Sequence, residues 1–346
     1  MLRQPILITG AGGSIGSALA LRLTRLGGAG LVLLESAENS LYQLERAWLE
    51  AAAETKANSG AVASATFVLG DAGHHGLVDE IVATRRPGIV FHAAAHKNVP
   101  LLECQPFAAI ANNIFATERV VAAAAAHAAR VVLLSTDKAV APASVMGATK
   151  RVAEEVVLRG GGTVLRLGNV LASSGSVVEV FAEQIARGGP LTVTDPAALR
   201  YFLTMEEAVN LLLLAAASTG ASKVLAPVLP AMHRIVELAE FMARRLAPGR
   251  EIAVDFCGLR PGDKLAERLW DSSEVACPLP SGGLVFVESS RPPSAAWQSG
   301  LAALRSAVAW RDLGAALGQL RALVPGFEPS EKVLELARRE ERRVLV

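Results

Sequence analysis

The chain has 346 residues, 51% of them hydrophobic, with glycine and proline dispersed along it. It can bury a large core and is longer than a typical single domain, so we expect one large domain and a smaller one. Its 34 Lys and Arg against 33 Asp and Glu leave a formal net charge of +1, so no overall field favours nucleic acid or anionic lipid, and any anionic ligand needs a local site.

The cysteines and the apolar segments narrow the class of protein further. Cys104, Cys257 and Cys277 are odd in number and widely spaced, which argues against a disulfide framework and a CxxC metal site. The first sixteen residues meet glycines after a short apolar run and lack the pattern of a signal peptide, so we expect a cytoplasmic protein. The apolar segments 120–129 and 211–217 fall short of the ~20 residues that span a bilayer, so we expect no membrane span.

The first half of the chain alternates two kinds of segment. Short runs rich in Val, Ile and Leu, typical of strands buried on both faces of a parallel sheet, occur at 5–9, 31–35, 66–69, 89–92, 131–135 and 163–167. Between them, longer Ala- and Leu-rich stretches predict helices at 14–26, 41–54, 108–129 and 149–158. This alternation predicts an α/β fold with a doubly wound parallel sheet of the Rossmann type.

The alternation stops after Asn169, where Gly and Pro recur. We therefore expect residues 1–169 to form the Rossmann core, to which some later segments return. Residues 170–282 are expected to form mainly a smaller substrate-binding region. Residues 283–346 form a C-terminal extension whose role the sequence does not indicate.

A glycine-rich turn opens the chain in the segment ILITGAGGSIG. Gly10, Gly13 and Gly16 follow a buried strand at the mouth of a helix, which permits a tight turn, close approach of a pyrophosphate and close helix packing. The helix N-terminus then faces the phosphates, so we expect Ser14 and Ile15 to contact the cofactor as well. A purely structural turn is the alternative reading of this motif.

Two acidic residues end the next strands. Glu35 is placed to accept hydrogen bonds from the adenosine ribose and to repel a 2′-phosphate, which predicts NAD rather than NADP, although Ser36 offers a seat for a phosphate. Asp71 suits the adenine amino group, with a strand-end cap as the alternative. We therefore expect residues 1–169 to bind NAD.

Four segments occur in a recognisable order: HAAAHKNVPLLE, LLSTDKAVAPASVMGATKR, RLGNVLASSGSV and RPGDKLAERLW. With the GxxGxxG turn, they make the chain resemble an extended short-chain dehydrogenase/reductase. More narrowly, residues 4–270 resemble the polysaccharide-biosynthesis UDP-N-acetylglucosamine 4,6-dehydratase family in its soluble form. The resemblance implies NAD as cofactor and a UDP-activated amino sugar as substrate.

The chain departs from the usual Tyr-x-x-x-Lys pair of short-chain dehydrogenases. Lys150 matches the lysine, but Met146 stands at the tyrosine position, and the two tyrosines, at positions 42 and 201, lie elsewhere. Some members of the resembled family share this methionine and are thought to rely on an adjacent pair, matched here by Asp137 and Lys138. An exposed turn is the alternative reading of that pair.

The resemblance implies a reaction in which the sugar is oxidised at C4, loses water across C5 and C6, and is reduced at C6. Lys138, with a pKa lowered by burial and nearby positive charge, is expected to remove the C5 proton, and Asp137 to protonate the departing C6 hydroxyl. Thr136 or Ser135 is expected to hydrogen-bond the C4 oxygen. Lys150 is expected to hold the nicotinamide ribose.

Residues on the cofactor side come from two further segments. The resemblance implies that Ala93, Lys97 and Asn113 line the cofactor and active site, with a solvated surface position as the alternative for Lys97. His92 and His96 have no third ligand at useful spacing, so we expect packing roles for them and no metal site.

Residues on the substrate side lie later in the chain. Asn169 resembles the residue that contacts the nucleotide-sugar diphosphate, and Arg200 and Arg260 are expected to neutralise phosphate charge. Arg200 has an alternative reading as a structural ion-pair partner. The segment 141–144 and His96 differ from the pattern of the resembled family near the expected substrate. A related UDP-sugar therefore remains an alternative substrate.

Two other functions remain open. A nucleotide-sugar C4 epimerase shares the fold, the cofactor and the first oxidation, but the missing tyrosine counts against it. A catalytically silent NAD-binding regulator or scaffold is favoured by Met146 and disfavoured by the retention of Asp137, Lys138 and Lys150. We also expect a homo-oligomer, with the Ala-rich helices as an interface.

Overall fold

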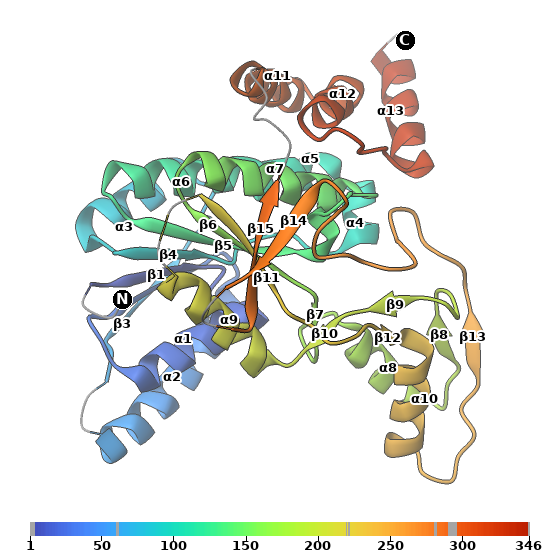
Figure 1. The fold of residues 1–346 in the computed structure, drawn as a ribbon, viewed down its shortest axis with the longest axis horizontal. Helices are drawn as coiled ribbons and strands as arrows, with labels where there is room; N and C mark the ends of the chain where they lie inside the picture. Colours follow the sequence, from blue (N-terminus) through green and yellow to red (C-terminus); the bar gives the residue numbers. More distant parts are fainter. Residues whose placement is uncertain are drawn as a thin grey trace.

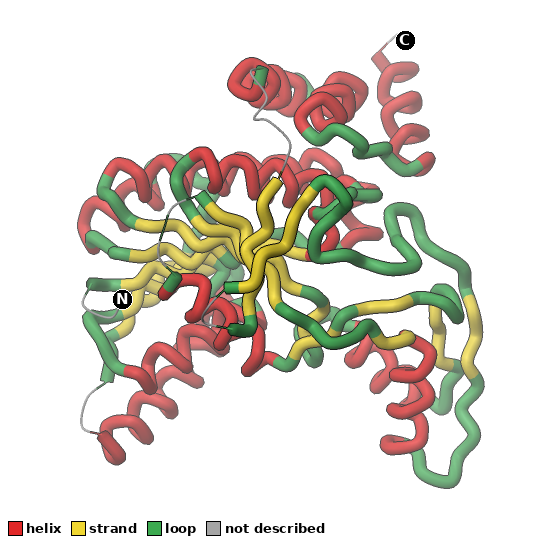
Figure 2. Tube along the Cα trace, viewed as in Figure 1, coloured by secondary structure: helices red, strands yellow, loops and turns green. Residues whose placement is uncertain are grey.

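The computed structural model describes residues 4–59, 62–218, 220, 222–279, 282–289 and 296–344. Its centre is a nine-stranded sheet in the order β14-β15-β11-β6-β5-β4-β1-β2-β3, shown edge-on in Figures 1 and 2. The strands are β1 (Ile6–Thr9), β2 (Leu31–Glu35), β3 (Ala65–Leu69), β4 (Ile89–His92), β5 (Arg130–Thr136), β6 (Thr163–Leu167), β11 (Lys223–Pro227), β14 (Glu274–Pro278) and β15 (Leu284–Ser289). The strands from β3 to β11 pair in parallel, and β15 pairs antiparallel with β11 and β14. The doubly wound α/β architecture expected from the sequence is confirmed.

Side chains alternate between the two faces of the sheet, as strand geometry requires. Ile6 and Ile8 of β1 join one hydrophobic cluster, whereas Leu7 between them joins another. Strands β1, β2, β4 and β6 are buried along their whole length. Because both faces are covered, their sequences are continuously apolar instead of alternating.

Helices cover both faces (Figure 1). On one face lie α1 (Ser14–Leu26), α2 (Glu38–Ser59) and α9 (Met205–Ala217); on the other lie α3 (Leu77–Arg85), α4 (Val99–Cys104), α5 (Pro106–Ile110), the π-helical turn η1 (Ala111–Phe115), α6 (Ala116–Ala126) and α7 (Val145–Arg159). The single helix expected over 108–129 is therefore interrupted by a π turn. Helix α7 starts earlier than expected because the Ser144 hydroxyl accepts a hydrogen bond from Gly147 N and caps it.

A smaller region follows β6 and extends from the carboxyl end of the sheet (Figure 1). It contains β7 (Asn169–Val170), α8 (Val177–Ala186), β8 (Leu191–Val193), β9 (Leu199–Arg200), β10 (Phe202–Leu203), β12 (His233–Arg234), α10 (Ile235–Leu246) and β13 (Val254–Phe256). Phe181 and Ile185 of α8 pack against Met242 of α10 in a core of their own. Within residues 170–282, α9, β11 and β14 belong instead to the central sheet and its covering layer.

The C-terminal segment adds one strand and three helices. Strand β15 forms a hairpin with β14, so the boundary at residue 283 falls inside a sheet hairpin. Helices α11 (Trp297–Ala309), α12 (Leu313–Leu323) and α13 (Glu331–Val344) share a hydrophobic cluster with α4, α5 and α7. They form an additional layer above those helices (Figure 1).

None of the helices in the described ranges is long and apolar enough to cross a membrane. Cys104, Cys257 and Cys277 are free thiols.

Candidate active site

The glycine turn joins β1 to α1, and Gly10 and Gly16 in it are packed too tightly for a side chain. Gly10 has a φ of +66°, and a Cβ there would lie 2.6 Å from the Ala94 backbone nitrogen. A Cβ on Gly16 would lie 2.2 Å from the Gly10 carbonyl oxygen. At Gly13 the nearest atom to an added Cβ is 3.3 Å away, so packing within the chain constrains this position less than the other two. The segment following β4, which includes Ala93, thus lies against the turn.

The N-terminus of α1 is open to an anion. Gly13 is the N-cap residue, and no side chain caps the helix, so the first-turn N–H groups of Ser14 and Ile15 are left for another acceptor. A cradle that a Cβ would fill, beside an uncapped helix N-terminus, fits the pyrophosphate of a dinucleotide.

Glu35 ends β2 beside this turn and is buried. Its Oε2 accepts a hydrogen bond from Gly12 N at 3.0 Å, and its Oε1 accepts from Ser36 N and Ala37 N at 2.9 Å each. Three backbone donors therefore orient the carboxylate. Asp71 lies beyond β3, exposed, with Oδ1 accepting from Gly73 N at 2.7 Å.

The π turn η1 fixes the loop that follows β4. The Asn113 amide accepts a hydrogen bond from His96 N at 2.9 Å and donates to His96 O at 3.1 Å. It also donates to the Thr149 hydroxyl at 3.0 Å. These bonds connect the loop to α7 and use both N–H groups of the buried Asn113 amide, so neither is free for a ligand. Lys97 of the same loop is exposed; the pKa of its amine is lowered, chiefly by partial burial and also by Lys138.

Lys150 and His92 are buried beneath this loop. The Lys150 amine donates to Leu134 O at 2.8 Å, and burial, opposed by Glu154, lowers the pKa of Lys150 to about 8. The His92 ring lies between the Thr9 and Thr117 hydroxyls at 2.7 and 2.9 Å, and burial, with the Lys150 charge, lowers its pKa to about 3. His92 is therefore a neutral packing residue. Among the described residues, no group of three or more His, Cys, Asp and Glu side chains is placed to hold a metal ion.

Asp137 and Lys138 form a single 3₁₀ turn, η2 (Asp137–Ala139), at the carboxyl end of β5. Asp137 is fully buried, and its Oδ1 accepts from Thr136 Oγ1 at 2.9 Å and from Lys138 Nζ at 3.0 Å. Its Oδ2 is buried with no hydrogen-bond partner among the described residues. A buried carboxylate oxygen without a donor is costly, so Oδ2 is a candidate acceptor for a donor from a ligand.

Lys138 has more partners than the sequence suggests. Its amine lies 3.2 Å from Asn169 Oδ1 and 3.9 Å from Glu267 Oε1, besides the bond to Asp137. Burial lowers the pKa of Lys138, but the carboxylates of Asp137 and Glu267 outweigh burial, and the pKa is raised. The expectation of a lowered pKa is therefore wrong, because two carboxylates, one from a distant segment, face the amine.

The two candidate hydroxyls after β5 face different partners. Ser135 Oγ donates to Glu154 Oε1 at 2.6 Å in a buried charge network, in which Glu154 and Glu274 flank the fully buried Arg166. Thr136 Oγ1 instead contacts Asp137. Of the two hydroxyls, only that of Thr136 contacts the Asp137–Lys138 turn.

Met146 lies in the hydrophobic core. It is 2% exposed and belongs to the cluster that includes Val99, Ile110 and Ile114. The position that holds a phenol in most short-chain dehydrogenases therefore carries neither an acid nor a base here.

The two arginines differ in their surroundings. Arg200 donates to the carbonyl oxygens of Leu199, Lys264 and Leu265 at 2.8 to 3.0 Å, so it holds the later segment against β9. Arg260 is exposed and pairs through Nε with Asp263 Oδ2 at 2.9 Å. Arg260 thus remains a candidate for phosphate contact, whereas three carbonyls already occupy the Arg200 guanidinium.

Three residues of the site were not selected from the sequence. Glu267 and Lys264 lie in the segment RPGDKLAERLW, where they look like ordinary surface charges. Glu267 is only 3% exposed, and Lys264 Nζ contacts both Glu267 Oε2 at 2.9 Å and Val140 O at 2.8 Å. Gly12 was missed because it lies between the motif glycines; a Cβ there would lie 2.7 Å from Ser40 Cβ.

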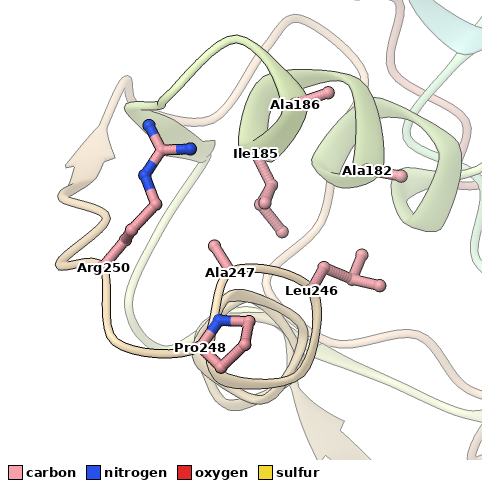
Figure 3. Close-up of a pocket in the computed structure, with 7 residues that line it drawn as sticks. All are labelled: Ala182, Ile185, Ala186, Leu246, Ala247, Pro248 and Arg250. Carbon is pink, nitrogen blue, oxygen red and sulfur yellow. The ribbon is translucent and has the colours of Figure 1, made fainter.

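A groove of about 450 Å³ between α8 and α10 lies apart from these residues (Figure 3). Its walls are Ala182, Ile185, Ala186, Leu246, Ala247, Pro248 and Arg250. None of the site residues described above lines it, so the chemistry does not belong to this groove.

The nucleotide cradle and the turn after β5 lie at the carboxyl edge of one parallel sheet, with a smaller region beyond it. This fold and site define an extended short-chain dehydrogenase/reductase. The chain belongs to the family described as polysaccharide biosynthesis proteins, whose model matches residues 6–286.

Individual relatives carry different names. The chain is 38% identical over 284 residues to the capsular polysaccharide biosynthesis protein CapD of Staphylococcus aureus, a match that covers 80% of this chain and 46% of CapD. It therefore spans under half the length of that relative. It is 33% identical over 287 residues to a UDP-glucose 4-epimerase of Rickettsia rickettsii, covering 79% of each chain. Among solved structures, Pen from Bacillus thuringiensis matches with a TM-score of 0.75 at 27% identity, covering 84% of this chain and 91% of Pen.

Proposed function

We propose that this chain is an NAD-dependent nucleotide-sugar 4,6-dehydratase that converts UDP-N-acetylglucosamine to a 4-keto-6-deoxy sugar. The observation that carries the proposal is the Asp137–Lys138 pair at the carboxyl end of β5, with a buried carboxylate oxygen left for a ligand hydroxyl. The buried Met146 at the tyrosine position adds to it, because the chemistry needs another acid and base.

The cofactor assignment rests on the glycine turn and Glu35. The uncapped α1 N-terminus suits a pyrophosphate, and the Glu35 carboxylate suits ribose hydroxyls and repels a 2′-phosphate. Bound NAD would supply the oxidation at C4 and the reduction at C6 that return the cofactor to its starting state. Lys150, buried beside β5, is the residue expected to hold the nicotinamide ribose.

Asp137 and Lys138 supply the acid and the base from one shared proton. The ion pair and the neutral pair differ only in the position of a proton along the 3.0 Å hydrogen bond between Nζ and Oδ1. When substrate replaces water, burial penalises both charges and favours the neutral pair. The Lys138 amine then takes the C5 proton, and Asp137 protonates the C6 hydroxyl as it leaves. The Thr136 hydroxyl hydrogen-bonds the C4 oxygen, whose proton goes to solvent as C4 is oxidised, and solvent returns one proton to the Asp137–Lys138 pair after water has left.

The diphosphate is assigned to the small region. Asn169 at the start of β7 lies against Lys138, so a ligand that contacts Asn169 is brought to the Asp137–Lys138 turn. We assign a phosphate contact to Arg260, an exposed cation of the segment RPGDKLAERLW.

The test is to incubate the purified protein with UDP-N-acetylglucosamine in deuterated water and to analyse the product by mass spectrometry and NMR. We expect loss of water and deuterium at C5. The Asp137→Asn variant keeps the shape of the side chain but cannot act as an acid, so we expect turnover to fall by about 10²- to 10⁴-fold. Unchanged substrate without deuterium, from protein shown to bind NAD, would overturn the proposal.

Nucleotide-sugar C4 epimerisation is the second candidate. The 33% identity to a UDP-glucose 4-epimerase over most of both chains favours it. The buried Met146 disfavours it, because the tyrosine position has no titratable group. The same experiment distinguishes the two, since an epimerase gives a C4 epimer without loss of water.

A further inference from the structure

The Lys138 ammonium is surrounded by oxygen atoms from three parts of the chain. An ammonium has three N–H donors on a flexible four-carbon stem, so its direction depends on its partners. Asp137 Oδ1 lies 3.0 Å away on the same turn, Asn169 Oδ1 3.2 Å away on β7, and Glu267 Oε1 3.9 Å away. Of these three partners, Glu267 has no role in the chemistry derived above.

Glu267 reaches this position because its segment is anchored on both sides. The Arg200 guanidinium donates to Lys264 O and Leu265 O, and Leu199 pairs with Ala266 in an isolated bridge. On the other side, Lys264 Nζ donates to Val140 O just after the η2 turn. Four attachments therefore hold a buried carboxylate beside the candidate base.

We propose that Glu267 is a positioning residue for Lys138. The Glu267 carboxylate directs the Lys138 amine between Asp137 and Asn169. The inference deepens the proposed function and rests on it for the role of Lys138 as base. Glu267 touches no reacting atom in this scheme. It acts through Lys138, and Lys264 modulates it by sharing its carboxylate at 2.9 Å.

The charged groups that face Lys138 determine whether a substitution raises or lowers the pKa of Lys138. Asp137 and Glu267 favour the ammonium, and Arg200 disfavours it; Lys97 lies close enough to Lys138 for their charges to interact. Removing the Glu267 charge should therefore make Lys138 lose its proton at lower pH. Removing the Lys264 charge should have the opposite effect, because the Glu267 carboxylate is then no longer shared.

The experiment measures the pH at which Lys138 loses its proton in the 346-residue chain. The Lys138 side chain is 21% exposed, so competitive acetylation with acetic anhydride across a pH series, read by mass spectrometry of the peptide that contains it, is feasible. We expect Glu267→Gln to raise the reactivity of Lys138 by about tenfold at a given pH below its titration. We expect Lys264→Met to lower it. Asp263→Asn removes a carboxylate from the same segment that pairs with Arg260 instead, and should leave the curve in place.

A purely structural Glu267 would behave differently. It would leave the titration of Lys138 unmoved in both variants or move it in the same direction, and either result overturns the inference. If Glu267→Gln does not fold, Lys264→Met still tests the inference, because we expect it to lower the reactivity of Lys138. Deuterium exchange at C5 of UDP-N-acetylglucosamine is measured in parallel. Opposite shifts of the Lys138 titration in the two variants, without deuterium exchange at C5 in the native protein, would support the positioning role while overturning the dehydratase proposal.

Discussion

Lys138 and Lys150 lie near the carboxyl end of β5, yet their surroundings act on them in opposite ways. Around Lys138, two carboxylates outweigh burial and raise its pKa. Around Lys150, burial outweighs the charge of Glu154 and lowers its pKa to about 8. At neutral pH the first amine is held as an ammonium, whereas the second titrates just above neutrality.

The lowered pKa of Lys150 predicts a specific pH dependence of stability. Below about pH 8 the folded and unfolded states both carry the proton; between about pH 8 and 10.5 only the unfolded state does. The unfolded state then binds more protons, so the free energy of unfolding rises with pH across this window. A displacement of about 2.5 pH units corresponds to about 3 kcal/mol.

Urea unfolding of the native protein and of Lys150→Met at pH 7 and pH 10 measures this contribution. Other titrating groups are common to both proteins and cancel in the difference. We expect the native protein to gain about 2 to 3 kcal/mol on the variant between these two pH values. A difference that stays constant with pH would show that Lys150 titrates normally.

At the scale of elements, the β1–α1 turn separates packing from ligand approach. Gly16 packs against the Gly10 carbonyl oxygen, whereas Gly13 lies at the open helix N-terminus. The two glycines of one motif therefore serve different purposes. Packing governs the first, and the space for a phosphate governs the second.

Substituting each glycine by alanine should give distinct results. Gly16→Ala overpacks the turn, so we expect a loss of about 1 to 3 kcal/mol of stability together with loss of NAD binding. Gly13→Ala should change stability by less than about 1 kcal/mol but weaken NAD binding at least about tenfold, since its Cβ enters the space for the pyrophosphate. Calorimetric titration with NAD and urea unfolding measure the two quantities. Equal affinity of Gly13→Ala and native protein would contradict this placement of the cofactor.

At the scale of the whole molecule, the C-terminal helices are part of the core that supports α7. Trp297 is 4% exposed within the cluster shared with Val152 and Val156, and the Arg159 guanidinium lies 4.9 Å from its ring centroid. The Ser330 hydroxyl binds Glu103, which in turn accepts a hydrogen bond from Val145 N at the start of α7. The helix that carries Lys150 is thus supported from a segment far along the chain.

This arrangement predicts a large effect for one tryptophan and almost none for another. Trp297→Ala should cost about 3 to 5 kcal/mol in the free energy of unfolding, because it opens a cavity between α11 and α7. Trp310→Ala removes a side chain that is 84% exposed and should change stability by less than about 0.5 kcal/mol. Denaturant unfolding of the three proteins compares them. Similar stability of both variants would mean that α11 to α13 unfold separately from the sheet.

Local signals in the sequence were sufficient for the architecture. Apolar runs and intervening helical stretches predicted the strands up to β6 and their parallel, doubly wound arrangement, because burial on both faces of a parallel sheet makes each strand continuously apolar. The glycine turn and Glu35 could be recognised because their spacing follows from one β-α-β unit. Asp137 and Lys138 could be placed at the end of β5 for the same reason.

Only the tertiary structure decided the pKa of Lys138 and which hydroxyl faces the candidate site. Glu267 contacts Lys138 across a long sequence separation, so no local sequence pattern predicts the contact. The pKa of Lys138 depends on that contact. The choice of Thr136 over Ser135 follows from Glu154, whose carboxylate takes the Ser135 hydroxyl. The sequence by itself predicted the parallel strands up to β6 and the glycine turn, since each depends on neighbours in the chain, and the family resemblance indicated the Asp137–Lys138 pair. Charge and direction of those side chains depend on neighbours in space, which only the folded chain brings together.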